Sequence, residues 1–114
     1  MSLFNLIRIS AVALSLGLAP TAYAAGNAAK GAAKAKEVCA ACHADDGNGK
    51  KEFPDYPKLA GQNADYLVHS LKAYKAGTRK YAIMGPMAQP LTLQEIEDLA
   101  AYFSKQAGSL KVMR

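Results

Sequence analysis

The sequence has no tryptophan and only two cysteines among its 114 residues. Two cysteines are too few for a disulfide-dense scaffold or a four-cysteine metal site. With nine glycines and five prolines, and about half of its residues apolar, the chain is neither collagen-like nor strongly disordered. No segment shows the sustained alternation of apolar and polar residues that is typical of a strand. These absences leave one small helical domain.

The N-terminal segment, residues 1–24, has the layout of a secretory signal peptide. Its first eight residues carry one positive charge and no negative charge, and residues 9–18 form an almost unbroken apolar run. That run is too short to cross a bilayer, which takes about 20 residues. A small-x-small site ends at Ala24, so we expect cleavage there. The mature chain, residues 25–114, is then predicted to be soluble, without a membrane span, and periplasmic.

Helical periodicity occurs in three segments of the mature chain, which cover residues 28–41, 64–76 and 93–106. The first segment has a face of small residues, against which another helix could pack closely. Asn63 is placed to cap the second segment, and Gly77 is placed to end it.

The third segment carries two N-terminal signals. Thr92 and Glu95 have the spacing of a capping box, and Leu91 and Ile96 have the spacing of a hydrophobic staple.

The segments between these helices, residues 44–62 and 78–91, are predicted to be long loops. Loops of this length in a small domain usually enclose a ligand or carry function. A chain of this size also buries little core, so a disulfide, a metal or a large cofactor is expected to stabilise it.

Residues 39–43 form the pentad Cys-Ala-Ala-Cys-His, the C-x-x-C-H pattern of c-type haem attachment. Residues three apart on a helix point to the same side, so Cys39 and Cys42 can form thioether bonds to the two vinyl groups along one haem edge. His43 can then ligate the iron. The pentad therefore predicts one covalently bound haem c per chain.

Other uses of these cysteines fit less well. A thioredoxin-like redox pair needs a βαβ unit, and no strand is visible in the sequence. A zinc site commonly combines two ligand pairs, whereas the second histidine, His69, stands alone in the second helical segment. A disulfide between Cys39 and Cys42 would leave His43 without a role.

The other axial position of the iron has three candidates, which are His69, Met84 and Met87. His69 lies opposite the apolar stripe of its helix, so the periodicity favours an exposed histidine. The two methionines lie in the 78–91 segment. Pairing one of them with His43 gives a haem of raised reduction potential, while the other would fill the core beside it.

Over residues 28–107 the sequence resembles the class I bacterial c-type cytochromes, both the small monohaem members and a single domain of the cytochrome c-four type. The resemblance is carried by the pentad, Asp-Gly-Asn-Gly at 46–49, Tyr-Pro-Lys-Leu-Ala-Gly-Gln at 56–62, Met-Gly-Pro-Met-Ala at 84–88 and Ile-Glu-Asp-Leu-Ala-Ala-Tyr-Phe at 96–103. It implies an all-α fold in which three main helices and long loops wrap one covalently bound haem.

The resemblance also implies roles for single residues. Cys39 and Cys42 would hold the haem covalently, His43 would be the proximal ligand, and Met84 would be the distal ligand with Met87 as the alternative.

Two further implications concern packing. The Pro57 carbonyl would accept the hydrogen bond of the His43 ring, and Gly31 and Tyr102 would lie where the first and last helices cross.

The function implied is a soluble periplasmic electron carrier rather than an enzyme. Its partners would be a reductase or dehydrogenase as donor and a terminal oxidase or other reductase as acceptor, with nucleic acid a poor candidate. Alternatives are an electron-entry haem subunit docked on a dehydrogenase and a haem-based small-ligand sensor. Six lysines lie in or beside the loops and could either steer acidic partners or only confer solubility: Lys50, Lys51, Lys58, Lys72, Lys75 and Lys80.

Overall fold

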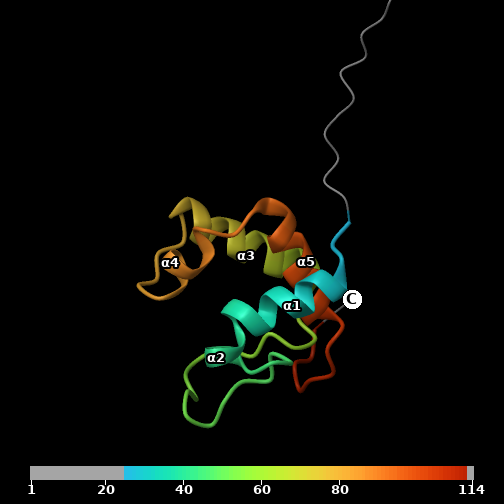
Figure 1. Ribbon diagram of the computed structural model, residues 1–114. Helices are drawn as coiled ribbons and strands as arrows, with labels where there is room; N and C mark the ends of the chain where they lie inside the picture. The colour runs from blue at the N-terminus through green and yellow to red at the C-terminus, as the bar shows by residue number, and fades with distance from the viewer. Residues whose placement is uncertain (1–24, 113–114) are drawn as a thin grey trace, which may run out of the picture.

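The computed structural model describes residues 25–112, and the expected signal peptide with its cleavage site lies outside them. The described residues form helices and no strand, which confirms the predicted all-α class (Figure 1). The helices are α1 (Ala28–Val38), α2 (Ala40–His43), α3 (Ala64–Ala76), α4 (Met84–Ala88) and α5 (Leu93–Ser104). None of the helices in this part of the chain is long and apolar enough to cross a membrane.

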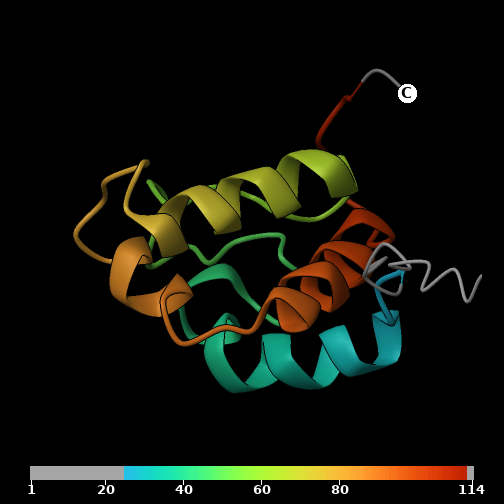
Figure 2. The ribbon, with the colours of Figure 1, turned by 90° about the horizontal axis from the view of Figure 1, so that it is seen from above.

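The helices pack in a chain of neighbours. α1 lies along α5, α5 also contacts α3, and α3 contacts α4. Figure 2 shows α5 between α1 and α3, and Figure 1 shows most of the 44–62 segment below α1, away from α3 and α4. α5 supplies most of the buried core through Ile96, Leu99, Ala100 and Phe103.

Two predicted boundaries were wrong. The predicted helix over 28–41 is two helices, because α1 ends at Val38 and α2 begins at Ala40 after a turn at Cys39. The last helix ends at Ser104 rather than at residue 106.

The 78–91 segment, predicted as a loop, contains the short helix α4. Gly85 and Pro86 indicate a loop when the sequence is read locally. Both residues lie in the first turn of α4, where the N–H that proline lacks has no partner within the helix. The segment can therefore be helical despite its composition.

The helix ends show which capping predictions hold. Gly77 ends α3 in the left-handed conformation, with φ 78°. Asn63 stands at the N-cap of α3, but its side chain makes no capping hydrogen bond. Asn27, which the sequence analysis did not single out, caps α1 by accepting from the Lys30 N–H at 3.0 Å. Its own N–H donates to the buried Asp98 carboxylate at 2.7 Å, which joins the start of α1 to α5.

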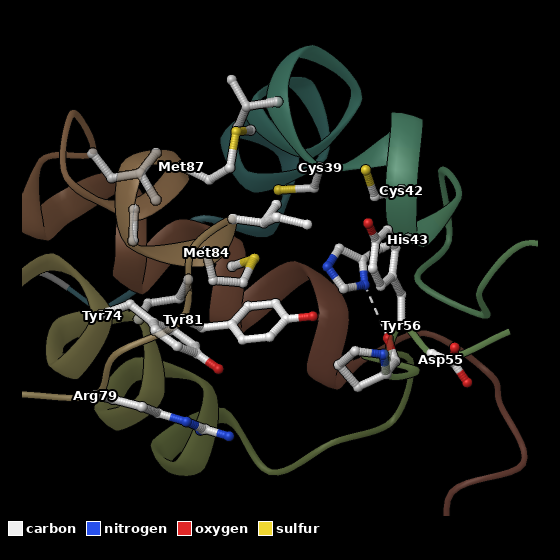
Figure 3. A pocket seen from close by; sticks show the side chains of 16 residues that line it. Cys39, Cys42, His43, Asp55, Tyr56, Tyr74, Arg79, Tyr81, Met84 and Met87 are labelled. Carbon is white, nitrogen blue, oxygen red and sulfur yellow. Dashed lines mark hydrogen bonds between the residues drawn. The ribbon is translucent and has the colours of Figure 1, made fainter. Parts of the chain in front are cut away.

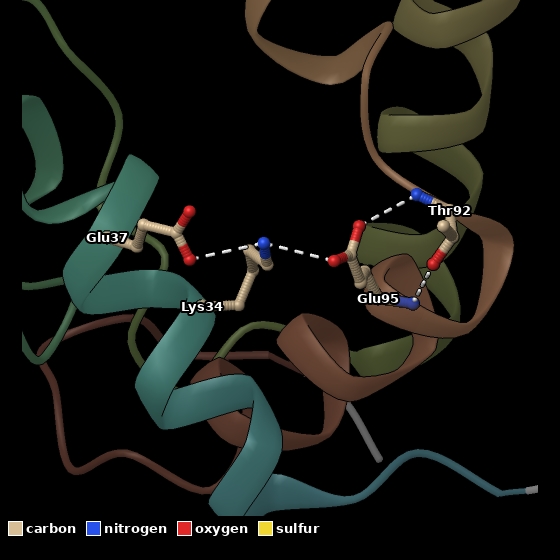
Figure 4. A network of polar contacts seen from close by, with 4 residues as sticks. All are labelled: Lys34, Glu37, Thr92 and Glu95. Atoms are coloured by element: carbon tan, nitrogen blue, oxygen red, sulfur yellow. Dashed lines mark hydrogen bonds and ion pairs between the residues drawn. The ribbon is translucent and has the colours of Figure 1, made fainter.

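The capping box of α5 is present and extends into an ion pair (Figure 4). The Thr92 N–H donates to Glu95 Oε2 at 2.9 Å, and the Glu95 N–H donates to Thr92 Oγ1 at 3.0 Å. Lys34 Nζ lies 3.0 Å from Glu95 Oε1 and 3.2 Å from Glu37 Oε2. The Thr92 N–H and Lys34 together hold the pKa of Glu95 below its ordinary value. The hydrophobic staple is also in place, since Leu91 and Ile96 lie in one buried cluster.

α1 and α5 cross at Gly31, as the resemblance implied. A Cβ placed on Gly31 would lie 2.0 Å from the Asp98 carbonyl oxygen and 2.9 Å from Tyr102 Cβ. The nearest obstacle is therefore the backbone of α5, and the Tyr102 ring comes second. Glycine is needed here for the close approach of two backbones.

We predict that Gly31→Ala separates α1 from α5 and destabilises the protein. Overpacking costs about 1–3 kcal/mol, which outweighs the gain in helix propensity of about 1 kcal/mol. Chemical unfolding followed by circular dichroism measures the change. Gly85→Ala is the matched control, because nothing lies within 4 Å of a Cβ at that helical position. Equal stability of the two variants would contradict the close crossing.

We predict that Glu95→Gln lowers the free energy of unfolding at pH 7, and that the difference shrinks at acid pH. Glutamine can still accept the Thr92 N–H but carries no charge for Lys34. Because the folded pKa of Glu95 lies below its ordinary value of 4.5, its charge stabilises the fold above that pH. That contribution is lost as the pH falls through the folded pKa. A constant difference between pH 7 and pH 3 would contradict the assignment.

Candidate functional site

A cavity opens between two walls of the fold (Figure 3). One wall is α2 with the 44–62 segment, and the other is α3 with α4 and the segment that joins them. The space comprises a part of about 350 Å³ and a deeper part of about 200 Å³ that reaches the core residues of α5. Both parts are lined by Cys39, His43, Pro57, Leu71, Tyr74, Arg79 and Met84.

His43 is the last residue of α2 and is 7% exposed. Its Nδ1 lies 2.9 Å from the Pro57 carbonyl oxygen. Because a carbonyl only accepts, the Nδ1 proton is donated there, and the Nε2 lone pair is left for a metal. The Tyr56 ring lies beside the imidazole, with ring centroids 6.2 Å apart. The ring of His43 is therefore fixed in its tautomer and its direction.

The two cysteines of the pentad are unpaired and half-buried. Both line the larger part of the cavity, and Figure 3 shows their sulfurs on the same side of it. Burial raises the pKa of the Cys39 thiol to about 11, although Lys34 opposes the shift. A thiol that stays protonated at neutral pH is a poor redox nucleophile. The thioredoxin-like alternative also lacks its βαβ unit among the described residues.

Met84 faces His43 across the cavity. In Figure 3 its sulfur points from α4 toward the imidazole. Met87, one turn further along α4, lines only the larger part of the cavity and is 41% exposed. His69 is exposed on α3 and lines neither part. The structure thus brings His43 and Met84 together and leaves His69 at the surface, as its periodicity predicted.

Of the six lysines in or beside the loops, only Lys58 is among the described residues that line the cavity. Lys58 lines the deeper part and donates to Ser109 Oγ at 2.9 Å. Lys72 lies 3.6 Å from Glu97 Oε1, and Lys75 donates to the Gln89 carbonyl at 2.7 Å. Three of the six lysines therefore have polar partners within the fold.

The donor set fits a covalently held haem. Two thiols lie along one side, an imidazole and a thioether face each other, and most other lining side chains are apolar or aromatic. A zinc site is not supported, because no three His, Cys, Asp or Glu side chains converge anywhere in residues 25–112. Sequence reasoning did not predict that the Tyr74 and Tyr81 rings line the cavity, since neither residue belongs to a motif.

Comparison with known proteins agrees with this donor set. Residues 28–107 match the family model described as cytochrome c. A cytochrome c4 of Stutzerimonas stutzeri is 45% identical over 106 residues, which cover 85% of this chain and 49% of that relative. Cytochrome c-554(548) of Halomonas halodenitrificans is 51% identical over 85 residues, which cover 72% of this chain and 99% of that relative.

A solved structure is also similar. Reduced recombinant cytochrome c4 from Pseudomonas stutzeri has a TM-score of 0.68 and 45% identity, over 75% of this chain and 48% of that chain. This chain spans about half the length of the cytochrome c4 relatives that it matches.

Proposed function

The chain belongs to the cytochrome c family, whose members hold haem c covalently, and from this premise we propose that it is a periplasmic electron carrier. It shuttles single electrons between respiratory redox partners. The observation that carries the proposal is the placement of His43 and Met84 on opposite sides of a largely apolar cavity. Both axial positions of an iron held between them would be filled by the protein.

The pentad holds the cofactor. Cys39 and Cys42 supply the two thioether sulfurs, and their position on one side of the cavity supports this role. His43 supplies the proximal nitrogen. Its hydrogen bond to Pro57 fixes the ring and raises the basicity of the ligating nitrogen.

Met84 supplies the distal sulfur, and Met87 packs beside it. The inward direction of the Met84 sulfur and the greater exposure of Met87 support this choice. A thioether favours ferrous iron, so this pair of ligands raises the reduction potential.

Two filled axial positions favour a carrier over a sensor or an enzyme. A haem sensor or a haem enzyme needs an open iron position, where a small molecule can bind. When bound, the haem would supply the one-electron redox chemistry. The protein contributes burial, ligands and a fixed geometry that needs little rearrangement on electron transfer. We propose that residues 1–24 direct export and that the carrier works in the periplasm.

A second candidate, a haem subunit docked on a dehydrogenase, is favoured by one observation. A solved thiosulfate dehydrogenase from Marichromatium purpuratum is similar to this chain, with a TM-score of 0.63 and 30% identity over 69% of this chain and 18% of that chain. The native mass of the protein, purified gently from its source, separates the two candidates. A free carrier elutes alone, and a fixed subunit elutes with its enzyme.

We predict one covalently bound haem per chain. Denaturing gel electrophoresis with a haem peroxidase stain should give a stained band. Replacing both cysteines, Cys39→Ala with Cys42→Ala, should abolish the stain and leave little folded protein. His69→Ala should keep both stain and fold, because that histidine is exposed. A colourless band from the unmodified protein, or haem extracted by acidified organic solvent, would contradict the proposal.

We predict that Met84→Ala opens the iron. The variant should lose the sulfur-to-iron absorption band of the oxidised protein, bind carbon monoxide when reduced, and have a lower reduction potential. Met87→Ala, one turn away on the same helix, is the matched control and should keep the band. The reverse pattern would assign the ligand to Met87.

A further inference from the structure

Lys75 differs from the other lysines beside the loops, because its ammonium group is bound to the helix that carries Met84. Lys75 lies in the last turn of α3 and is half-buried. Its Nζ donates at 2.7 Å to the carbonyl of Gln89, the C-cap residue of α4. Figures 1 and 2 show α4 beside this end of α3. None of the roles assigned above uses the bond between them.

The helix α4 has little stability of its own. It is five residues long and contains Gly85, a poor helix former. Ile83 stands at its N-cap and makes no side-chain capping hydrogen bond. Isolated helices shorter than about 12 residues are marginal in water. The conformation and direction of α4 therefore depend on its contacts with the rest of the protein.

Two kinds of contact hold the C-terminal end of α4. Ala88 is fully buried in the core cluster, and Leu91 just beyond the helix is buried in the same cluster. The side chain of Ala88 is a single methyl group, which does not interlock with its neighbours and leaves the helix free to turn about it. The bond from Lys75 to the Gln89 carbonyl is directional. A cation at this end of a helix is also favoured by the carbonyls that the helix leaves unpaired.

The direction of α4 affects the position of Met84. Met84 is the first residue of α4, and Gln89 lies five residues further on, about 7.5 Å along the helix axis. A turn of so short a helix moves both of its ends, so release of Gln89 would displace the Met84 sulfur. Ligands of a functional site must be held within about 0.5 Å of the productive geometry. A displaced sulfur would therefore bind a metal less well.

Building on the proposed function, we propose that Lys75 is the positioning residue of the distal ligand. Its bond to the Gln89 carbonyl fixes the direction of α4 on α3, and α4 in turn holds the Met84 sulfur toward His43. Lys75 lines neither part of the cavity, so it acts through α4. The role of this lysine is then internal, rather than the steering of acidic partners.

The test is the binding of imidazole to the oxidised, haem-loaded protein, which requires the distal ligand to leave the iron. Lys75→Met keeps an unbranched side chain of similar length and removes the donor. The binding constant for imidazole should rise by about threefold to tenfold, which corresponds to the net contribution of one hydrogen bond. Lys75→Arg keeps the charge and can still donate, so its binding constant should stay close to that of the unmodified protein.

Lys36→Met is the matched control. Lys36 also lies in the last turn of a helix, α1, and its side chain is exposed. The variant loses the same charge and should bind imidazole as the unmodified protein does. If Lys75→Met and Lys36→Met have equal binding constants, the inference is wrong. If, besides this equality, Lys75→Met changes the salt dependence of electron transfer to a protein partner, Lys75 binds an acidic partner instead.

Thermal unfolding separates a positioning role from a general contribution to stability. In Lys75→Met the sulfur-to-iron absorption band should disappear at a lower temperature than the helical circular dichroism signal, by a wider margin than in the unmodified protein. The N–H groups of Met87 and Gln89, which donate to Ile83 and Gly85, should exchange faster with solvent. Loss of the band and the helical signal in parallel would mean that Lys75 only stabilises the fold, and the inference would be wrong.

Should Lys75→Met not fold, Lys75→Gln provides the test. Its side chain is one bond shorter and uncharged, and it should raise the imidazole binding constant by less. An unchanged constant in Lys75→Gln would then overturn the inference. If instead Met84→Ala keeps the absorption band, the ligand assignment of the proposed function is wrong, whatever the Lys75 variants show.

Discussion

The backbones of α1 and α5 touch at Gly31, where even a methyl group would overlap the Asp98 carbonyl oxygen. The buried Asp98 carboxylate also accepts the N–H of Asn27, so the start of α1 is tied to the same turn of α5. The pentad follows α1 almost directly. The packing of α1 on α5 therefore sets the direction in which the cysteines and His43 point. The contact that fixes this packing lies several residues before them in the chain.

The loop between α2 and α3 is held against α5 as well. The Tyr102 hydroxyl donates to the Asp45 carbonyl at 2.7 Å, and the Gly61 N–H donates to the Phe103 carbonyl at 2.9 Å. Pro57 lies between these two attachments, and its carbonyl accepts from His43. A segment without regular structure thus becomes a fixed wall of the cavity, because bonds near both of its ends leave it little freedom.

The two proposed axial ligands come from different parts of the fold. His43 belongs to the wall that is attached to α5, whereas Met84 belongs to α4, which packs on α3. The distance between the two walls, and with it the space for a flat cofactor, depends on the contact of α3 with α5. A cofactor bound to both walls would connect them. In this way the haem would add contacts that stabilise the fold, because so small a core does not provide enough stability alone.

The sequence alone determined the helical class, the capping box at Thr92, the helix stop at Gly77 and the chemistry of the pentad. These features depend on residues within one or two turns of each other, and their spacing is visible in the chain. Only the tertiary structure showed α4, the direction of the Met84 sulfur, the buried Asp98 and the return of Arg79 to the cavity. Each of these depends on how segments distant in the sequence pack together. Packing is the sum of many weak contacts, which no local pattern records.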